Sequence, residues 1–281
     1  FEVSSILPVP DDPGFRVVGQ SGQSHSSSRV IISTGGHPKA EAYSFIRDLG
    51  HSLRPPIPSL FTFNDAQKTF IDLMGVSVPN AEVRIATTKF RQSGALLITH
   101  WGLSGPCVIK LSAWAAEYLY SVKYEFNVLV SWIGPSEETS VRELLLAQKG
   151  ARPRQRVAGH PLFALPLRLW LKLCSLSEIP EEKVWAEMSH RNINKLLECL
   201  IRCSFGIRGK TTFKEEFVTC GGVELGEVDI RTMESKKVKG VFFAGEVLNV
   251  DGETGGFNFQ AAWSTAFLAA RSAAIASPKL G

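Results

Sequence analysis

The sequence predicts an α/β fold, α+β overall, and two observations carry this prediction. Two short apolar runs, VII (30–32) and VFF (241–243), are each closed by small residues, TGG and AG. Continuous apolar runs of this kind are typical of buried parallel strands. A strand-rich stretch and an all-helical stretch lie between the two runs, so the chain is expected to leave one sheet and return to it.

The first 51 residues predict strands followed by a helix. Strands are expected over 1–9, 15–19 and 29–33, with a turn at 11–14 and a polar loop over 20–28. The turn, DDPG, holds proline and glycine at positions that favour chain reversal. Residues 38–51 predict an amphipathic helix, because Pro38 suits its start and Gly50 its end.

Residues 54–135 predict a small β-domain entered through a proline-rich crossing, RPPIP. Strands are expected over 59–63, 69–78, 81–88, 95–100 and 124–133. The stretch THWGLSGPCVIKLSA (99–113) predicts a loop and then a helix with Pro106 at its start.

Residues 136–203 predict helices alone, over 136–150, 162–176, 180–190 and 190–203. Strands are expected again over 205–209, 213–225 and 239–245. The last segment, 255–276, predicts a helix rich in alanine, which allows close packing on a sheet.

The composition indicates a globular protein with a real core. Apolar residues make up 44% of the 281 residues and charged residues 21%. The net charge of +4 gives no strong argument for nucleic acid or a membrane as partner, and we expect neither. The five cysteines include no CxxC pair. They predict a reducing compartment, either the cytoplasm or the interior of an organelle.

Residues 240–266 contain the clearest chemistry in the chain. A buried strand ends at Gly245, and Glu246 follows at its carboxyl end, where open α/β sheets bind their ligands. Asp251 lies in the next loop, and Gly255 and Gly256 precede the last helix, whose free N–H groups favour anions. These residues predict a ligand-facing edge, although glycine-rich loops of this kind also serve only as tight turns.

Other candidates have two interpretations each. His100 is either an acid–base group or a loop histidine with local hydrogen bonds, and Ser104 lacks the partners of a hydrolase. The basic loop with Lys149, Arg152, Arg154 and Arg156 is either a solvated loop or an anion or nucleic-acid contact. Cys199 and Cys203, four apart on a predicted helix, fit two core residues. A metal would need further ligands, so we expect no metal site.

Four stretches resemble one family of flavoproteins. They are VIISTGG (30–36), THWGLSGPCVIKLSA (99–113), residues 218–252 and GGFNFQAAWSTAFLA (255–269). They are similar to the NAD(P)/FAD-dependent oxidoreductases that include the aminoacetone-oxidase and dehydro-bile-acid reductase proteins. The resemblance implies a Rossmann-like FAD domain interrupted by a β-barrel that carries a helical insert. The FAD domain would comprise 1–54 and 240–281, the barrel 55–135 and 204–239, and the insert 136–203.

The resemblance also implies the roles of particular residues. Thr34, Gly35 and Gly36 would lie near the dinucleotide, and Gly245 and Glu246 would bind its ribityl and pyrophosphate region. Gly255, Gly256, Phe257, Asn258, Phe259 and Gln260 would open the helix that faces the flavin ring, with Asp251 in the loop before it. FAD would be the cofactor, NAD(P)H a possible electron donor, and a small molecule the substrate.

Two departures from the family pattern leave the function open. The family has an early strand with a GxGxxG phosphate loop, and this fingerprint is expected to be missing here. The loop after TGG is also shorter than is usual in the family. The chain is therefore either an FAD-dependent oxidoreductase, complete or truncated, or a non-catalytic descendant that binds other molecules.

Overall fold

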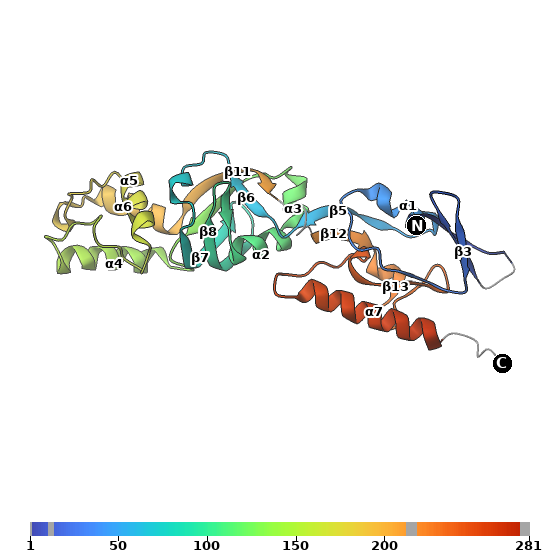
Figure 1. The fold of residues 1–281 in the computed structure, drawn as a ribbon. Helices are drawn as coiled ribbons and strands as arrows, with labels where there is room; N and C mark the ends of the chain where they lie inside the picture. The colour runs from blue at the N-terminus through green and yellow to red at the C-terminus, as the bar shows by residue number, and fades with distance from the viewer. Residues whose placement is uncertain (1, 11–13, 212–217, 276–281) are drawn as a thin grey trace. The chain divides into compact units, whose positions relative to one another are not determined.

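A computed structural model of the chain describes residues 2–10, 14–211 and 218–275. The chain forms two compact units: unit 1 comprises residues 1–59 and 214–281, and unit 2 comprises residues 60–213. The fold is mixed α+β with a closed six-stranded barrel and several helices, which confirms the predicted class (Figure 1). Within the described ranges, no helix is both long and apolar enough to cross a membrane.

In the residues that the structure describes, unit 1 contains three sheets and the long C-terminal helix. Its strands are β1 (Val3–Pro8), β2 (Phe15–Gly19), β3 (Ser24–Ser27), β4 (Val30–Ile32), β5 (Leu53–Ser59), β12 (Val218–Val223), β13 (Val228–Asp229), β14 (Glu234–Ser235) and β15 (Val241–Phe243). Its helices are η1 (Ala40–Tyr43), α1 (Ser44–Asp48), η4 (Leu225–Glu227), η5 (Gly245–Val247) and α7 (Phe257–Ile275). The sheets have the orders β1-β2-β3, β12-β5 and β13-β14-β15-β4.

The two apolar runs VII and VFF pair with each other, as their sequence predicts. β15 and β4 are parallel, with Val241 opposite Val30 and Phe243 opposite Ile32. Phe242, Phe243 and Ile32 are buried in the core of unit 1, together with residues of α1 and Ala269 of α7. The carboxyl ends of β4 and β15 therefore lie at the same sheet edge.

Unit 2 joins the barrel to a group of helices. Its strands are β6 (Thr62–Asp65), β7 (Ser77–Ile85), β8 (Arg91–Ile98), β9 (Gly102–Ser104), β10 (Glu125–Ser131) and β11 (Cys203–Thr211), which close in the order β10-β11-β6-β9-β8-β7. Its helices are η2 (Ile71–Leu73), α2 (Pro106–Trp114), α3 (Ala116–Ser121), α4 (Glu138–Ala151), α5 (Leu167–Leu176), η3 (Trp185–Glu187) and α6 (His190–Ile201).

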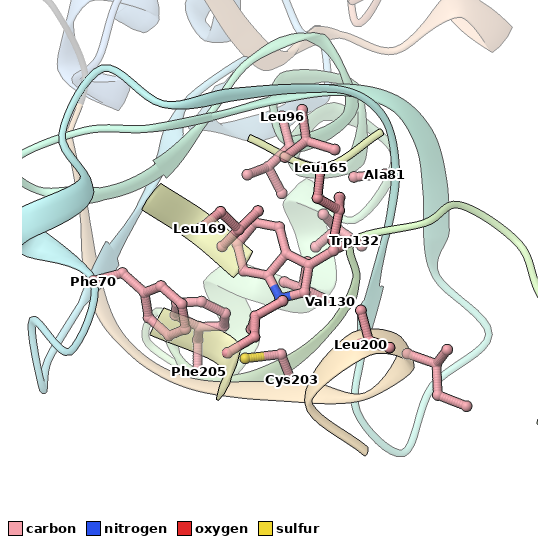
Figure 2. Packing of buried hydrophobic residues seen from close by; sticks show 14 of the residues in the cluster. Phe70, Ala81, Leu96, Val130, Trp132, Leu165, Leu169, Leu200, Cys203 and Phe205 are labelled. Atoms are coloured by element: carbon pink, nitrogen blue, oxygen red, sulfur yellow. The ribbon is translucent and has the colours of Figure 1, made fainter. Parts of the chain in front are cut away.

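The barrel and the helices of unit 2 share one hydrophobic core. Figure 2 shows Trp132, from the segment after β10, beside Leu169 of α5 and close to Phe70 and to Phe205 of β11. The Trp132 ring centroid lies 5.6 Å from that of Phe70 and 6.0 Å from that of Phe205. The helical stretch 136–203 is therefore not packed as a separate body.

Several element boundaries differ from the prediction. The proline-rich crossing is strand β5, which pairs with β12 alone among the described strands, so its prolines need no second ladder partner. The predicted strand at 69–78 is the short helix η2 followed by the start of β7, and the predicted helix at 180–190 is only η3. The polar loop at 20–28 contains strand β3, because β2 supplies a hairpin partner.

The second predicted piece of the barrel, residues 204–239, belongs only in part to the barrel. β11 belongs to the barrel, whereas β12, β13 and β14 pair within unit 1. Cys203 begins β11 and does not continue the helix of Cys199. Residues 11–13 of the predicted turn, 212–217 of the predicted strand and 276–281 lie outside the described residues.

Candidate functional site

The candidate site lies at the sheet edge where β4 and β15 end. After β15 the chain turns into η5, which holds Gly245 and Glu246, and after β4 it passes through Thr34, Gly35 and Gly36. Parallel strands place their carboxyl ends together, so two segments about 200 positions apart in sequence meet here.

Glu246 is fixed by the backbone of a third strand. The amide N–H of Thr219 in β12 donates to Glu246 Oε1 over 3.0 Å. Gly36 packs against both residues: a Cβ atom at this position would lie 2.5 Å from Thr219 Oγ1 and 3.0 Å from Glu246 Cδ. The structure thus brings Gly36 and Glu246 together, and Gly36 must be glycine because the approach is so close.

Thr219 is a site residue that the sequence reasoning missed. Its side chain is fully buried, and its Oγ1 has no hydrogen-bond partner within the described structure. A buried hydroxyl without a partner costs about 1–3 kcal/mol, so Thr219 is held here at a cost to stability. The only signal was its place inside the family-like stretch 218–252.

Gly245 positions the last helix on the sheet. Its φ of +77° is in the left-handed region that favours glycine, and its N–H donates to Thr265 Oγ1 of α7 over 2.9 Å. The Thr265 hydroxyl in turn donates to the carbonyl of Ala261 over 2.7 Å. The amide of Gly245 is therefore used within the fold and is not offered to a ligand.

The loop before α7 is closed by Asn258. The Gly252 N–H donates to Asn258 Oδ1 over 2.7 Å, and Asn258 Nδ2 donates to the Gly252 carbonyl over 3.1 Å. Asp251 Oδ2 accepts a hydrogen bond of 2.8 Å from Ser59 Oγ of β5. These contacts hold the loop against unit 1 without any use of the first amides of α7.

The start of α7 is open. Gly255 and Gly256 have φ values of +116° and +88°, which suits glycine, and Phe257 and Phe259 are exposed. The first N–H groups of a helix are the kind that bind anions or electron-rich oxygens.

The remaining predicted residues are less closely tied to this cluster. Thr34 is exposed, and Gly35, with φ +74°, faces open space. The Gln260 side chain donates to Ser264 Oγ over 3.0 Å on the exposed surface of α7.

The charge of Glu246 also affects Tyr43. Burial raises the pKa of Tyr43, the hydrogen bond from the His37 amide lowers it, and the Glu246 carboxylate raises it. The Tyr43 hydroxyl accepts that bond from His37 N over 2.6 Å. Tyr43 therefore remains a neutral phenol beside the site.

His51 is a buried histidine just before β5, and it contacts side chains of η4 and β14. His51 Nδ1 lies 3.0 Å from Glu227 Oε2, and His51 Nε2 lies 2.8 Å from Ser235 Oγ. Burial lowers the pKa of His51, although Glu227 acts in the opposite direction. Burial raises the pKa of Glu227, but hydrogen bonds from Lys237, Ser52 and His51 outweigh it and bring that pKa to about 2.

The donor set of this edge fits a nucleotide cofactor such as FAD. The second carboxylate oxygen of Glu246 can accept from ribityl or ribose hydroxyls. The N-terminus of α7 can favour the electron-rich side of a flavin ring. The described residues hold no group of three or more histidine, cysteine, aspartate or glutamate side chains that could bind a metal ion.

Comparison with known proteins identifies relatives over nearly the whole chain. The chain is 31% identical over 279 residues to the ribosomal RNA dihydrouridine synthase of Escherichia coli (strain K12), which is 95% of this chain and 66% of that protein. It is 30% identical over 280 residues to the ribosomal RNA dihydrouridine synthase of Haemophilus influenzae, 96% of this chain and 67% of that protein.

A third relative carries a different name. The chain is 29% identical over 269 residues to the 3-dehydro-bile acid delta(4,6)-reductase of Clostridium scindens, 92% of this chain and 65% of that protein. The chain thus spans about two thirds of the length of the curated relatives it matches. The family described as "HI0933-like protein barrel and H2TH domain" matches residues 57–218, which hold every strand of the closed barrel and the helices packed on it. The chain belongs to this HI0933-like family, which is related to FAD-dependent oxidoreductases.

Proposed function

We propose that the chain is the flavin-holding part of a reductase that saturates a carbon–carbon double bond conjugated to a carbonyl group. The observation that carries the proposal is the cluster of Gly36, Thr219 and Glu246 at the sheet edge, next to the loop that packs on α7. It combines a close backbone approach with a carboxylate acceptor that a backbone amide holds in place.

Each part of the cluster has a definite task in this proposal. Thr219 N holds Glu246 Oε1, so Oε2 is aimed by the backbone and can accept from a sugar-type hydroxyl. Gly36 lets its segment pack closely against Thr219 and Glu246, which keeps the carboxylate in place. The amides at the start of α7 stabilise negative charge at the ring side of the bound cofactor. A flavin bound there would supply the hydride for the reduction.

The names of the relatives support the type of bond that is reduced. Dihydrouridine is uridine with a saturated C5–C6 bond, and that bond is conjugated to the C4 carbonyl. A delta(4,6)-reductase of a 3-dehydro bile acid acts on double bonds conjugated to the C3 carbonyl. Both reactions add hydride to a carbon made electrophilic by a conjugated carbonyl, so one flavin-bearing site could serve either.

Flavin binding to the purified chain tests the proposal. We expect FAD to bind with quenching of its fluorescence and with a shift of its absorption band. Glu246→Ala should weaken FAD binding by about 1.5–3 kcal/mol, roughly 10- to 150-fold, because a charge-assisted hydrogen bond is lost. Glu41→Ala, which removes an exposed carboxylate of η1 in the same unit, is the matched control and should bind FAD like the wild type.

The result also decides between the two functions left open by the sequence. A chain that takes up no added FAD, yet is folded by circular dichroism, would support a non-catalytic binding protein instead. Equal FAD affinity of the Glu246→Ala variant and the wild type would show that the cofactor does not use this edge.

A further inference from the structure

A groove of about 390 Å³ lies in unit 1, and none of its lining residues is assigned to the flavin. The lining comes from η1, α1, residues 51 and 52, and the first part of β5. Sites for small molecules have volumes of about 300–1,000 Å³. The groove is therefore large enough for an organic ligand and not only for an ion.

The buried polar groups of the groove are already used within the fold. The Tyr43 hydroxyl accepts from His37 N over 2.6 Å, and the two ring nitrogens of His51 contact Glu227 and Ser235. Tyr43 and His51 are themselves buried, with 2% and 3% of their surface exposed. These two side chains thus form fixed walls, and a ligand is recognised by the groups at the rim.

Two arginines provide the charge of the groove. Arg47 Nη2 donates to the Ala40 carbonyl over 2.6 Å, and no carboxylate among the described residues forms an ion pair with this guanidinium. Arg54 Nε lies 2.9 Å from Glu224 Oε1, so the charge of Arg54 is partly balanced. The described residues that line the groove include no acidic side chain. The groove therefore favours an anion, and Arg47 is its main cation.

The number of guanidinium groups favours a phosphate as the anion. The two arginines come from different elements, Arg47 from α1 and Arg54 from β5. A single guanidinium fork is enough for a planar carboxylate, whereas a tetrahedral phosphate offers three oxygens that two forks can share. A phosphate monoester also carries a charge of about −1.5 to −2 at pH 7. Two arginines on one groove are thus better matched by a phosphate.

The rest of the wall is apolar and belongs to β5. Leu53, Pro55 and Pro56 line the groove, and proline has no N–H to donate. Among the described strands β5 pairs with β12 alone, but the two consecutive prolines make its other edge a poor partner for an added strand. This wall therefore suits the flat apolar body of a small molecule and not an extended peptide.

We propose that this groove binds a small organic phosphate, a phosphate monoester carried on a flat apolar body. The phosphate oxygens accept from Arg47 and, more weakly, from Arg54, and the body packs on Leu53, Pro55 and Pro56. The groove contains none of the proposed flavin residues and needs no flavin, so this inference is independent of the proposed function.

A matched set of naphthyl probes tests the recognition of the phosphate. Fluorescence titration of the flavin-free chain at neutral pH compares 2-naphthyl phosphate with 2-naphthol and 2-naphthoate, which share its body. We expect the phosphate ester to bind about 10-fold more tightly than either, because the charge-assisted hydrogen bonds depend on its oxygens. Equal binding of 2-naphthol would indicate an apolar contact alone, and equal binding of 2-naphthoate a carboxylate site. Either result would overturn the proposal.

Substitution of the arginines tests where the phosphate lies. Arg47→Gln should weaken binding of 2-naphthyl phosphate about 10-fold and Arg54→Gln about 3-fold, because Glu224 already balances part of the Arg54 charge. Arg47→Lys keeps the charge but loses the fork, so its affinity should lie between those of the wild type and Arg47→Gln. Arg16→Gln removes an exposed arginine of β2 in the same unit and, as the matched control, should bind like the wild type. Equal weakening by Arg16→Gln and Arg47→Gln would show a general effect of charge and contradict the site.

Chemical protection locates the ligand without any substitution. Phenylglyoxal modifies arginine side chains, and bound 2-naphthyl phosphate should slow its reaction with Arg47 but not with Arg16, as measured by peptide mass spectrometry. Protection confined to Arg152, Arg154 and Arg156 would place the ligand on the basic loop of unit 2 and refute the assignment. Displacement of the probe by saturating FAD would make the groove part of the flavin site and refute it as well. A chain that binds no FAD but shows the dependence on Arg47 would remove the proposed function and leave this inference standing.

Discussion

The two units differ in how completely the chain covers its own strand edges and apolar faces. Unit 2 closes on itself: its six strands form a barrel without free edges, and α4, α5 and α6 pack into the same core. Unit 1 stays open: β4 ends its sheet, and most of α7 is exposed. Phe259, Trp263 and Phe267, four residues apart on α7, are 68%, 67% and 65% exposed.

This difference shows where each unit can take up other molecules. In unit 2 the barrel strands and the helices bury one large apolar core between them. In unit 1 the sheet edge and the outer face of α7 lack partners among the described residues, and the unpartnered hydroxyl of Thr219 lies in the same unit. A closed unit has high stability of its own, whereas an open unit gains stability from what it binds.

The largest effect should come from the shared core of unit 2. Trp132→Ala removes the ring that packs on Phe70 and Phe205, and we expect a loss of about 3–5 kcal/mol in the free energy of unfolding. Urea unfolding, followed by circular dichroism and by limited proteolysis, measures it. If the helices 136–203 were an independent body, proteolysis would cut the barrel alone and leave them protected.

The buried histidine of unit 1 should give the next largest effect. His51→Leu leaves Glu227 and Ser235 without their partner, which should cost about 1–3 kcal/mol. Because burial lowers the pKa of His51, the unfolded chain binds more protons than the folded one as the pH falls through the unfolded value of about 6.5. The free energy of unfolding of the wild type should therefore decrease between about pH 7 and pH 5.

The control for this pH dependence is the His51→Leu variant itself. It should show a flatter profile over the same range, because the titrating group is gone. Glu227, with its pKa of about 2, adds stability that is present above its unfolded value of about 4.3 and lost as the pH falls toward 2. Equal slopes for both proteins between pH 5 and pH 7 would exclude His51 as the source.

The glycine at the sheet edge should affect ligand binding more than folding. Gly36→Ala places a methyl group against Thr219 Oγ1 and Glu246, so the carboxylate must move. We expect FAD affinity to fall about 10-fold, roughly 1.4 kcal/mol, by flavin fluorescence titration. Gly226→Ala, where a Cβ atom would meet nothing within 4 Å, should leave the affinity unchanged.

The smallest effect on stability should come from the exposed face of α7. Phe267→Ser should change the free energy of unfolding of the chain by less than about 0.5 kcal/mol, because the ring makes little contact in the chain alone. Light scattering should show less self-association, since an exposed apolar side chain is removed. A loss near that of Trp132→Ala would mean that this face is covered after all.

The sequence predicted the parallel pair β4–β15 and the start of α2 correctly, because both follow from local patterns. A continuous apolar run closed by glycine and a proline at the first helical position depend on few distant residues. The strand β5 was not foreseen, since its prolines are acceptable only because β12 pairs along one side. β12 also lies outside the barrel because it pairs with β5, which is distant in the sequence.

The site was predicted in its parts but not in its arrangement. Gly36 and Glu246 were named from glycine and carboxylate patterns, and the structure brings them together. Thr219 could not be found, because its importance comes from an amide that reaches Glu246 across 27 positions and from burial that no local pattern encodes. Gly245 was expected to face the ligand, whereas its amide is bonded to Thr265, a partner on another element.

The core that Trp132 shares with α5 also bears on how such proteins diversify. A chimera that replaced residues 136–203 by helices from an unrelated protein would remove Leu169 and the other helical residues from around the indole. Exchange of that segment by recombination therefore requires matched changes in the strands beneath it. We therefore expect the barrel strands and the helices packed on them to be exchanged together rather than separately.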